Sequence, residues 1–344
     1  MKIVIIRDSD INNSLKWELA CKEHNIDYRT VNILSSDWLV QIQNYDPSFC
    51  VAKPSGAVMY EKHIYDERVY FLENYTKYRI YPGCLASYIY ENKSCLATFL
   101  SVNNIPHAET FVSAVRSECV DFVKTTQFPI VAKTLIGAAG SGVKILHSSD
   151  QAMSYITTAF TKGIKRRYGP NKKTGTPKKW LLKALLDPKY LVAKLKHYNY
   201  LSSDIQRNIV LFQEYIEHDF EWRCVKIGES YFAYKKLKVD SMASGAKEFE
   251  YGEPPYFILD FVRDLCTRFN FFTMAVDLFV NEGKIYVNEL QTIFGHKNPF
   301  ICKVNNKIGR YIYCDGWQFE EGDFNANESY NLRLESILEI ENKF

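Results

Sequence analysis

The sequence lacks several patterns that mark large classes of protein. No run approaches the ~18 to 20 uncharged apolar residues of a membrane-spanning helix, and the chain opens directly on a polar-bounded strand, MKIVIIRDSD, unlike a secretory signal. The nine cysteines are odd in number, form no CxxC pair and have no histidine nearby at zinc-ligand spacing. We therefore expect a cytoplasmic protein whose cysteines are reduced and have no metal-binding or nucleophilic role.

Familiar catalytic and nucleotide motifs are missing as well. The first strand-to-helix turn has no glycine fingerprint for a dinucleotide, and no convincing Ser-His-Asp or Cys-His arrangement is present. Gly137 and Gly142 have the spacing of a P-loop, but Val143 stands where that motif needs lysine, and a strand follows instead of a helix. These absences exclude an NAD domain, a P-loop NTPase and a triad hydrolase.

The composition that is present indicates a compact protein of two or three domains. The chain has 344 residues, of which 47% are hydrophobic and 15% aromatic. Up to about residue 90, strand and helix patterns alternate, which predicts a parallel sheet with flanking helices. The expected strands are residues 2–6, 28–33, 49–52 and a short one ending at 82–83, and the expected helices are 14–24, 38–44 and 67–77.

A lysine and a glycine-rich loop follow one another in the next part of the chain. After an expected helix led by residues 90–94, the apolar strand 128–133 ends in Lys133 and is succeeded by the loop 137–142 and a strand over 143–146. A lysine at the end of a buried strand, beside a glycine loop with free N–H groups, is an anion-binding arrangement. An ordinary hairpin turn after a core strand is the alternative.

Two carboxylates stand in apolar sequence between residues 271 and 295. Residues 274–280 and 284–290 both have strand character, with an Asn-Glu-Gly turn between them, so a hairpin is expected. Antiparallel pairing would bring Asp277 and Glu289 to one place, where a buried pair needs a cation or a proton. Mg²⁺ with nucleotide phosphates is one solution; a solvated hairpin whose acids face water is the other reading.

Positive charge is concentrated in a single segment. Residues 160–208 carry 13 lysines and arginines against two aspartates, a net +11, which leaves −8 for the rest of the chain. Pro188 separates two expected short helical runs that are basic on one side and apolar on the other. This pattern suits binding to lipid headgroups, an acidic polymer or nucleic acid; packing of Trp180 and the leucines on the neighbouring domain, with the lysines merely solvated, is the alternative.

Taken in order, these pieces resemble the ATP-grasp superfamily over nearly the whole chain. The resemblance is carried by FPIVAKTLIGAAGSGV, LFQEYI and MAVDLFVNEGKIYVNEL. It implies an α/β and α+β architecture: a Rossmann-like domain over residues 1–90, a central lobe over 91–211 with a glycine lid and the basic insertion 160–208, and a C-terminal lobe over 212–344. It also implies a cytoplasmic ADP-forming ligase of the carboxylate–amine type, similar to the D-alanine ligase and ribosomal-protein glutamate ligase branches.

The resemblance assigns roles residue by residue. It implies that Mg²⁺ or Mn²⁺ is held by Asp277, Glu289 and Gln291, and that Arg223, Lys235 and His296 act near the transferred phosphate. ATP would be bound by Lys93, Lys133, the lid residues Gly137, Gly140, Ser141 and Gly142, the hinge Gln213, Glu214, Tyr215 and Ile216, and Glu221 or, alternatively, Asp219 at the ribose.

Two departures from the family pattern leave other functions open. Gln291 stands where the family has asparagine. Ala275 stands where D-alanine ligase relatives have an arginine, so Arg223, His296 or Lys297 would have to take the place of that arginine. The alternatives are an ATP-binding regulator that has lost turnover and a binder of anionic surfaces or nucleic acid through residues 160–208. The basic segment suggests an anionic acceptor, such as a uronic-acid polymer or a lipid-linked sugar at the inner face of the membrane. The carboxylate, the amine and a homodimeric state are left open.

Overall fold

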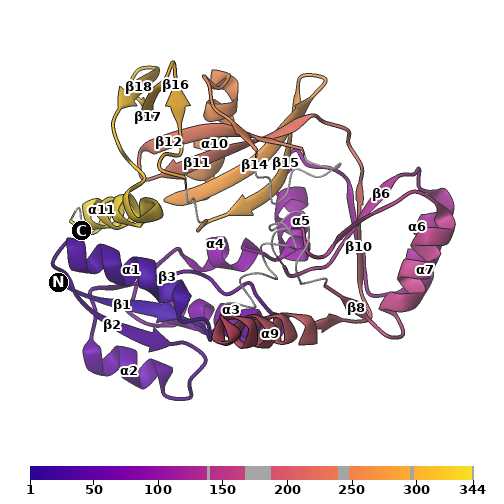
Figure 1. The fold of residues 1–344 in the computed structure, drawn as a ribbon, viewed down its shortest axis with the longest axis horizontal. Coiled ribbons are helices and arrows are strands. Elements are labelled where there is room, and N and C mark those ends of the chain that lie inside the picture. The colour runs from indigo at the N-terminus through magenta and orange to yellow at the C-terminus, as the bar shows by residue number, and fades with distance from the viewer. Residues whose placement is uncertain (138–139, 167–186, 239–247, 295–297, 343–344) are drawn as a thin grey trace.

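The computed structural model describes residues 1–137, 140–166, 187–238, 248–294 and 298–342. Its three larger sheets lie in three regions, with the N-terminal domain below, the central lobe to one side and the C-terminal lobe above in Figure 1, and the described residues form one further sheet of two strands. Within these ranges, no helix combines the length and apolarity needed to cross a bilayer.

The N-terminal domain is a parallel four-stranded sheet in the order β2-β1-β3-β4. Because side chains alternate along a strand, Ile3 and Ile5 face one layer and Val4 and Ile6 face the other. The domain contains β1 (Lys2–Arg7), α1 (Asn12–Glu23), β2 (Asp27–Asn32), α2 (Trp38–Tyr45), β3 (Phe49–Ala52), α3 (Met59–Tyr75), β4 (Ile80–Tyr81) and α4 (Cys84–Ile89). The expected alternation is present, and α3 begins eight residues before the expected helix.

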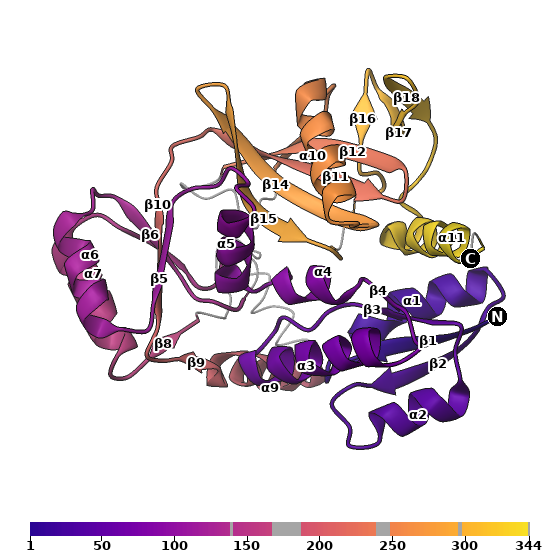
Figure 2. The same ribbon diagram turned by 180° about the vertical axis from the view of Figure 1, so that it is seen from behind.

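One layer of this domain is completed by the end of the chain. Helix α11 lies beside α1 in both views (Figures 1 and 2). Its Tyr330, Leu334 and Ile337 share one buried cluster with Ile3 and Trp17, and the Trp17 and Tyr330 rings meet edge to face at 5.0 Å. The first and last segments of the sequence therefore form a single core.

The central lobe is an antiparallel sheet in the order β5-β10-β6-β7, covered on one face by α6 and α7. Its opposite face is turned toward the C-terminal lobe. Strand β10 spans the expected domain boundary at 211 and pairs with both β5 and β6. The region contains α5 (Lys93–Val102), β5 (Thr110–Ser113), α6 (Arg116–Thr125), β6 (Ile130–Lys133), β7 (Val143–Leu146), α7 (Ser149–Ala159), β8 (Ile164–Lys165), α9 (Pro188–Ser203), β9 (Ile205–Gln206) and β10 (Val210–Glu214).

The basic insertion is described only in part. The expected helical run before Pro188 falls within residues 167–186, which lie outside the described ranges. Pro188 begins α9, since proline fits the first turn of a helix, where its missing N–H is not needed. Helix α9 lies beside α3 of the N-terminal domain in both views.

The C-terminal lobe is built on an antiparallel sheet in the order β15-β14-β11-β12-β17-β16, with β13 on β12 and β18 on β17. Helix α10 and the apolar face of α5 pack on it in one large core. The lobe contains β11 (Phe220–Ile227), β12 (Ser230–Leu237), β13 (Phe249–Glu250), α10 (Tyr256–Arg268), β14 (Thr273–Asn281), β15 (Lys284–Gln291), β16 (Lys303–Val304), β17 (Lys307–Tyr313), β18 (Trp317–Glu321), the 3₁₀ turn η1 (Ala326–Ser329) and α11 (Tyr330–Glu341).

Candidate functional site

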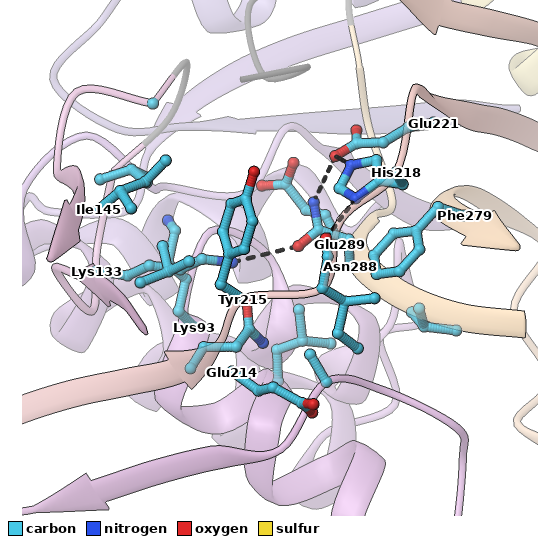
Figure 3. Close-up of a pocket in the computed structure, with 18 of the residues that line it drawn as sticks. Lys93, Lys133, Ile145, Glu214, Tyr215, His218, Glu221, Phe279, Asn288 and Glu289 are labelled. Atoms are coloured by element: carbon cyan, nitrogen blue, oxygen red, sulfur yellow. Dashed lines mark hydrogen bonds and ion pairs between the residues drawn. The ribbon is translucent and has the colours of Figure 1, made fainter. Parts of the chain in front are cut away.

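A pocket lies between the central lobe and the C-terminal lobe, and most of the residues expected to bind a nucleotide line it. Figure 3 shows lysines on one side and histidine, asparagine and carboxylates on the other. The expected residues that line it are Lys93, Lys133, Gly137, Gly140, Gln213, Glu214, Tyr215, Ile216, Glu221 and Glu289. Segments far apart in the sequence therefore meet in one slot.

The lysine side of the pocket is built by local capping and by strand alternation. The Asn92 side chain accepts a hydrogen bond from the Cys95 N–H at 3.2 Å and so begins α5, which places Lys93 in the first turn. The Lys93 ammonium donates to the carbonyl of Gly137 at the start of the glycine loop. Lys133 ends β6 on the face turned away from the α6 and α7 layer, and its ammonium donates to Asn288 Oδ1 at 3.2 Å.

The electrostatics of Lys133 are set by burial and by a like charge. Burial lowers its pKa, and the neighbouring Lys93 lowers it further, to about 8. Two ammonium groups in one slot would both be stabilised by an anionic ligand, because its charge favours their protonated forms. This is the behaviour expected of a phosphate site.

The walls of the pocket between these charges are apolar. They are formed by Leu96, Ala108, Val131, Val143, Ile145, Phe279 and Val287. Beyond them, the His218 ring stacks on Phe279 with centroids 4.1 Å apart. At the hinge, the Glu214 N–H is already donated to the Glu109 carbonyl, whereas the Ile216 N–H has no hydrogen-bond partner among the described residues. A flat heteroaromatic ring with an acceptor atom at its edge fits this slot.

Glu221 is held rigidly at the far end of the pocket. It is 3% exposed, and its carboxylate accepts from Lys236 at 2.9 Å and from Asn288 Nδ2 at 2.8 Å. Burial alone would raise the pKa of Glu221, but Lys236 and His218 outweigh it and the pKa is lowered. Asp219, the alternative ribose residue, is exposed and does not line the pocket.

The hairpin brings the two expected metal carboxylates face to face. Asp277 on β14 and Glu289 on β15 are directly opposite in register, with a bulge immediately after Asp277. Asp277 is 1% exposed and already neutralised. Arg223 donates to its two oxygens at 2.6 and 2.7 Å, and Lys236 donates to Oδ2 at 2.7 Å. Although burial raises the pKa of Asp277, the two cations outweigh this effect and it is lowered.

Glu289 differs from Asp277 because no described residue donates a hydrogen bond to its carboxylate. Next to it is Glu91, which is 6% exposed and whose Oε2 has no partner, while Gln291 Nε2 bonds its Oε1 at 3.1 Å. Burial and the charge of Glu289 raise the pKa of Glu91 to about 7. Two neighbouring carboxyl groups without a cation, beside an amide, have the chemistry of an Mg²⁺ site, so the residues present fit that ion.

Three expected residues, Lys235, Ser141 and Gly142, lie away from this site, and two more are not described. Lys235 is not brought to the site, since its ammonium pairs with Glu250 and lies over the Phe220 ring at 4.7 Å. Ser141 and Gly142 line a separate hollow behind the glycine loop. His296 and Lys297 lie outside the described residues. Among the described residues there is no group of three or more histidine, cysteine or acidic side chains placed to hold a metal.

Sequence reasoning missed five residues that shape the site. The sequence alone assigns no site role to Lys236, Glu91, Asn288, His218 or Phe279. Lys236 stands directly after Lys235, which was expected to act near the transferred phosphate. Strand alternation was the available signal, because only one of two consecutive lysines can face the pocket. Lys236 is the lysine that faces the pocket, because it is opposite Glu221 of the neighbouring strand β11 in register.

Comparison with known proteins relates this geometry to solved structures. No family model and no curated protein matches the sequence. D-alanine–D-alanine ligase from Bacillus anthracis matches over 100% of this chain and 98% of its own, with a TM-score of 0.57 and 13% identity. The RimK domain ATP-grasp protein from Sphaerobacter thermophilus matches over 84% and 90%, with a TM-score of 0.53 and 13% identity.

The chain has the ATP-grasp fold. A third similar structure is carboxyaminoimidazole ribonucleotide synthase from Aspergillus clavatus complexed with ATP, with 12% identity, a TM-score of 0.58 and coverage of 98% of this chain and 76% of that one. The ATP-grasp architecture anticipated from the motif order is confirmed, with mixed helix and strand layers and structural neighbours that span the whole chain.

Proposed function

We propose that this ATP-grasp chain is an ATP- and Mg²⁺-dependent, ADP-forming ligase that activates a carboxylate as an acylphosphate for attack by an amine. One observation carries the proposal: Lys93 and Lys133 of one lobe and Glu221, Asn288 and Glu289 of the other line one slot with apolar walls, where Lys133 bonds Asn288. The similar structures include ligases crystallised with ATP, and this supports the same reaction class here.

The nucleotide would bind with its base in the apolar slot and its phosphates at the lysines. The Ile216 N–H would donate to the base, and Glu221 would accept from the ribose hydroxyls. Lys93 and Lys133 would neutralise the phosphates, and the glycine loop would cover them with backbone N–H groups. Asp277, Glu289 and Gln291 would supply oxygen ligands to Mg²⁺, which neutralises charge on the transferred phosphoryl group.

The reaction then needs no protein nucleophile. A carboxylate oxygen attacks the γ-phosphorus and ADP leaves with the electrons of the broken P–O bond. The amine nitrogen then attacks the acyl carbon, phosphate leaves, and the nitrogen loses a proton. Arg223 bonds Asp277 and Gln291, and Gln291 is opposite Ala275 in register, where D-alanine ligase relatives have an arginine. We assign to Arg223 the stabilisation of negative charge on the transferred group.

The decisive test is ADP release with Mg-ATP and hydroxylamine over a panel of amino acids, uronic acids and small dicarboxylates. A hydroxamate detected by mass would establish the acylphosphate and name the electrophile. Asp277→Asn should abolish it, whereas Lys235→Met, on the other face of the sheet, should retain it. Nucleotide binding with no ADP release from any carboxylate would contradict the proposal for this panel and favour the second candidate.

That second candidate is an ATP-binding protein without turnover. The observation in its favour is that both oxygens of Asp277 are occupied by Arg223 and Lys236. A metal ion must compete with these two cations for Asp277. Mn²⁺ binding measured by electron paramagnetic resonance in the presence of ADP separates the two functions, since the ligase requires a metal that is lost in Glu289→Gln.

The basic insertion carries a finer proposal, namely an anionic acceptor presented by a polymer or a membrane. Part of its charge is on exposed positions of α9, including Lys196. Reversing Lys172, Lys173, Lys178 and Lys179 to glutamate should remove binding to acidic vesicles or uronic-acid polymers and leave ADP affinity intact. Binding that persists in this variant would contradict the proposal.

A further inference from the structure

The hollow behind the glycine loop lies within the central lobe and has a volume of about 730 Å³. Its wall is formed by the end of that loop, by β7, by α7 and the turn that follows it, and by the strand pair β8 and β9. Val143 lines both this hollow and the nucleotide pocket, so the two spaces share part of a wall. The volume is within the range of pockets that bind small molecules.

The described residues that line this hollow include four cations and no carboxylate. The cations are Lys144, Lys162, Lys165 and Arg207, and all four are exposed. Within the part of the chain that the structure describes, none of them forms an ion pair or donates a side-chain hydrogen bond. Asp204, next to β9, is engaged with Arg166 at 2.8 Å. Four like charges around one hollow repel one another, and an anionic ligand removes that repulsion.

Arg207 is held at the hollow by a close contact with the turn after α7. Gly163 in this turn has a φ of +82°, and a Cβ built on it would lie 2.6 Å from Arg207 Cγ and 2.4 Å from Ile205 Cγ2. The Gly163 N–H donates to the carbonyl of Thr158, in the last turn of α7, at 2.8 Å. The turn therefore requires glycine, and the aliphatic stem of Arg207 packs against its backbone.

One buried hydroxyl on the wall has no partner. Tyr155 on α7 is 7% exposed, and its ring packs on Phe212 in the core of the lobe, with centroids 5.8 Å apart. Its Oη is buried and has no hydrogen-bond partner among the described residues. Burial raises the pKa of Tyr155, so the hydroxyl stays protonated and can donate. A buried hydroxyl without a partner is costly, and an acceptor oxygen of a ligand in the hollow would satisfy it.

We propose that this hollow binds a molecule through two phosphate groups. Two phosphate groups carry a charge of about −3 to −4 near neutral pH, which balances the four cations. The guanidinium of Arg207 suits bidentate binding of one phosphate, the lysines act as point charges, and Tyr155 supplies a neutral donor. The proposal goes beyond the ligase reaction and does not rest on it, because the hollow contains none of the lysines or carboxylates assigned to ATP and Mg²⁺.

The test is calorimetric titration of the full chain saturated with an equimolar mixture of Mg²⁺ and ADP, which occupies the nucleotide pocket. The soluble probes are pyrophosphate and fructose 1,6-bisphosphate, and their counterparts with one phosphate are inorganic phosphate and fructose 6-phosphate. At least one probe with two phosphates should bind tenfold more tightly than its counterpart, because it engages more of the cations.

The same two phosphates can belong to a lipid headgroup, and a second arm of the experiment separates this source. Vesicles of phosphatidylcholine are prepared with and without cardiolipin, whose headgroup has two phosphates, and binding is measured by cosedimentation. Binding that requires cardiolipin and is lost in Arg207→Gln, with no binding of the soluble probes, would support the site and identify a headgroup as the source.

The variants are chosen to keep the fold. Arg207→Gln changes an exposed side chain and should weaken binding about tenfold or more. Tyr155→Phe retains the ring in the core and should weaken binding about threefold, without lowering the melting temperature, because the hydroxyl that it removes has no partner. Arg116→Gln is the matched control, since Arg116 is exposed on α6 of the same lobe but does not line the hollow, and it should change binding less than twofold.

Three outcomes overturn the proposal. They are the absence of binding by both soluble probes and by cardiolipin vesicles, native affinity in both Arg207→Gln and Tyr155→Phe, and equal weakening by Arg207→Gln and Arg116→Gln, which would mean that net charge alone attracts the probes. ADP affinity should be unchanged in every variant, which confirms folding. A chain that binds pyrophosphate here but releases no ADP with any carboxylate contradicts the ligase and not this site.

Discussion

Lys236→Met should destabilise the protein far more than Lys235→Met. Lys236 is 5% exposed and is the shared partner of two buried carboxylates, with Nζ 2.9 Å from Glu221 Oε2 and 2.7 Å from Asp277 Oδ2. Removing one member of a buried ionic cluster leaves charge uncompensated and costs about 3 to 5 kcal/mol. Lys235 pairs with the exposed Glu250 on the other face of β12, and such pairs contribute about 1 kcal/mol or less.

The assay is thermal and urea unfolding followed by tryptophan fluorescence, with both variants at one pH and salt. The difference of about 2 to 5 kcal/mol between them corresponds to a melting temperature lower by roughly 4 to 20 °C in Lys236→Met, at about 2 to 4 °C per kcal/mol. Methionine retains the length of the side chain in both variants, so the comparison isolates the ammonium group.

A double substitution sharpens the test. Glu221→Gln removes one of the two uncompensated charges, so it should cost less in the Lys236→Met background than in the native chain, with a coupling of about 1 kcal/mol or more. Equal destabilisation by the two lysine substitutions, or full additivity of Lys236→Met with Glu221→Gln, would refute the reasoning that this cluster acts as one ionic unit.

Three further predictions concern the nucleotide pocket and its surroundings. Because the pKa of Lys133 is lowered to about 8 and bound phosphate favours its protonated form, ADP binding should take up a proton near pH 8 and weaken as pH rises above 8; calorimetry in buffers of different ionisation enthalpy measures this, with Lys133→Met as the control. Gly142→Ala should distort the glycine loop and lower ADP affinity, since its Cβ would lie 1.8 Å from Thr134 Oγ1, whereas Gly252→Ala meets nothing within 4 Å. The lowered pKa values of Asp277 and Glu221 contribute stability that is full above their ordinary pKa values near 4 and is lost as pH falls further, so Lys236→Met should move the acid-unfolding midpoint upward.

The fold was predictable where local signals were strong. The hairpin was predictable from its Asn-Glu-Gly turn, in which Glu282 and Gly283 adopt positive φ. The register that the turn sets would place Asp277 opposite Asn288, and the bulge after Asp277 shifts the pairing to Glu289. The parallel sheet of the first 90 residues was predictable as well, because strand and helix patterns alternate there along the chain. The glycine loop after Lys133 was anticipated because lysine, apolar strand and glycines follow one another directly in the chain.

The remainder depended on contacts between distant residues. The pairing of β11 with β14 sets Arg223 against Asp277 across 54 positions, and no local pattern specifies that neighbour. The choice between Lys235 and Lys236 requires knowing which face of β12 meets the pocket. Packing of residues 160–208 on a neighbouring domain was one of the two interpretations of their composition, but composition does not say which surface α9 covers.

The shared core of α1 and α11 constrains the order in which the protein can mature on the ribosome. Domains generally fold as units from the N-terminus during synthesis, but here Ile3, Ile5 and Trp17 are covered by Tyr330, Leu334 and Ile337, which follow them by more than 300 residues. Until those residues emerge, the nascent first domain carries one uncovered apolar layer. That layer is a natural target for chaperones, and a ribosome stalled before residue 330 would hold a chain prone to aggregate.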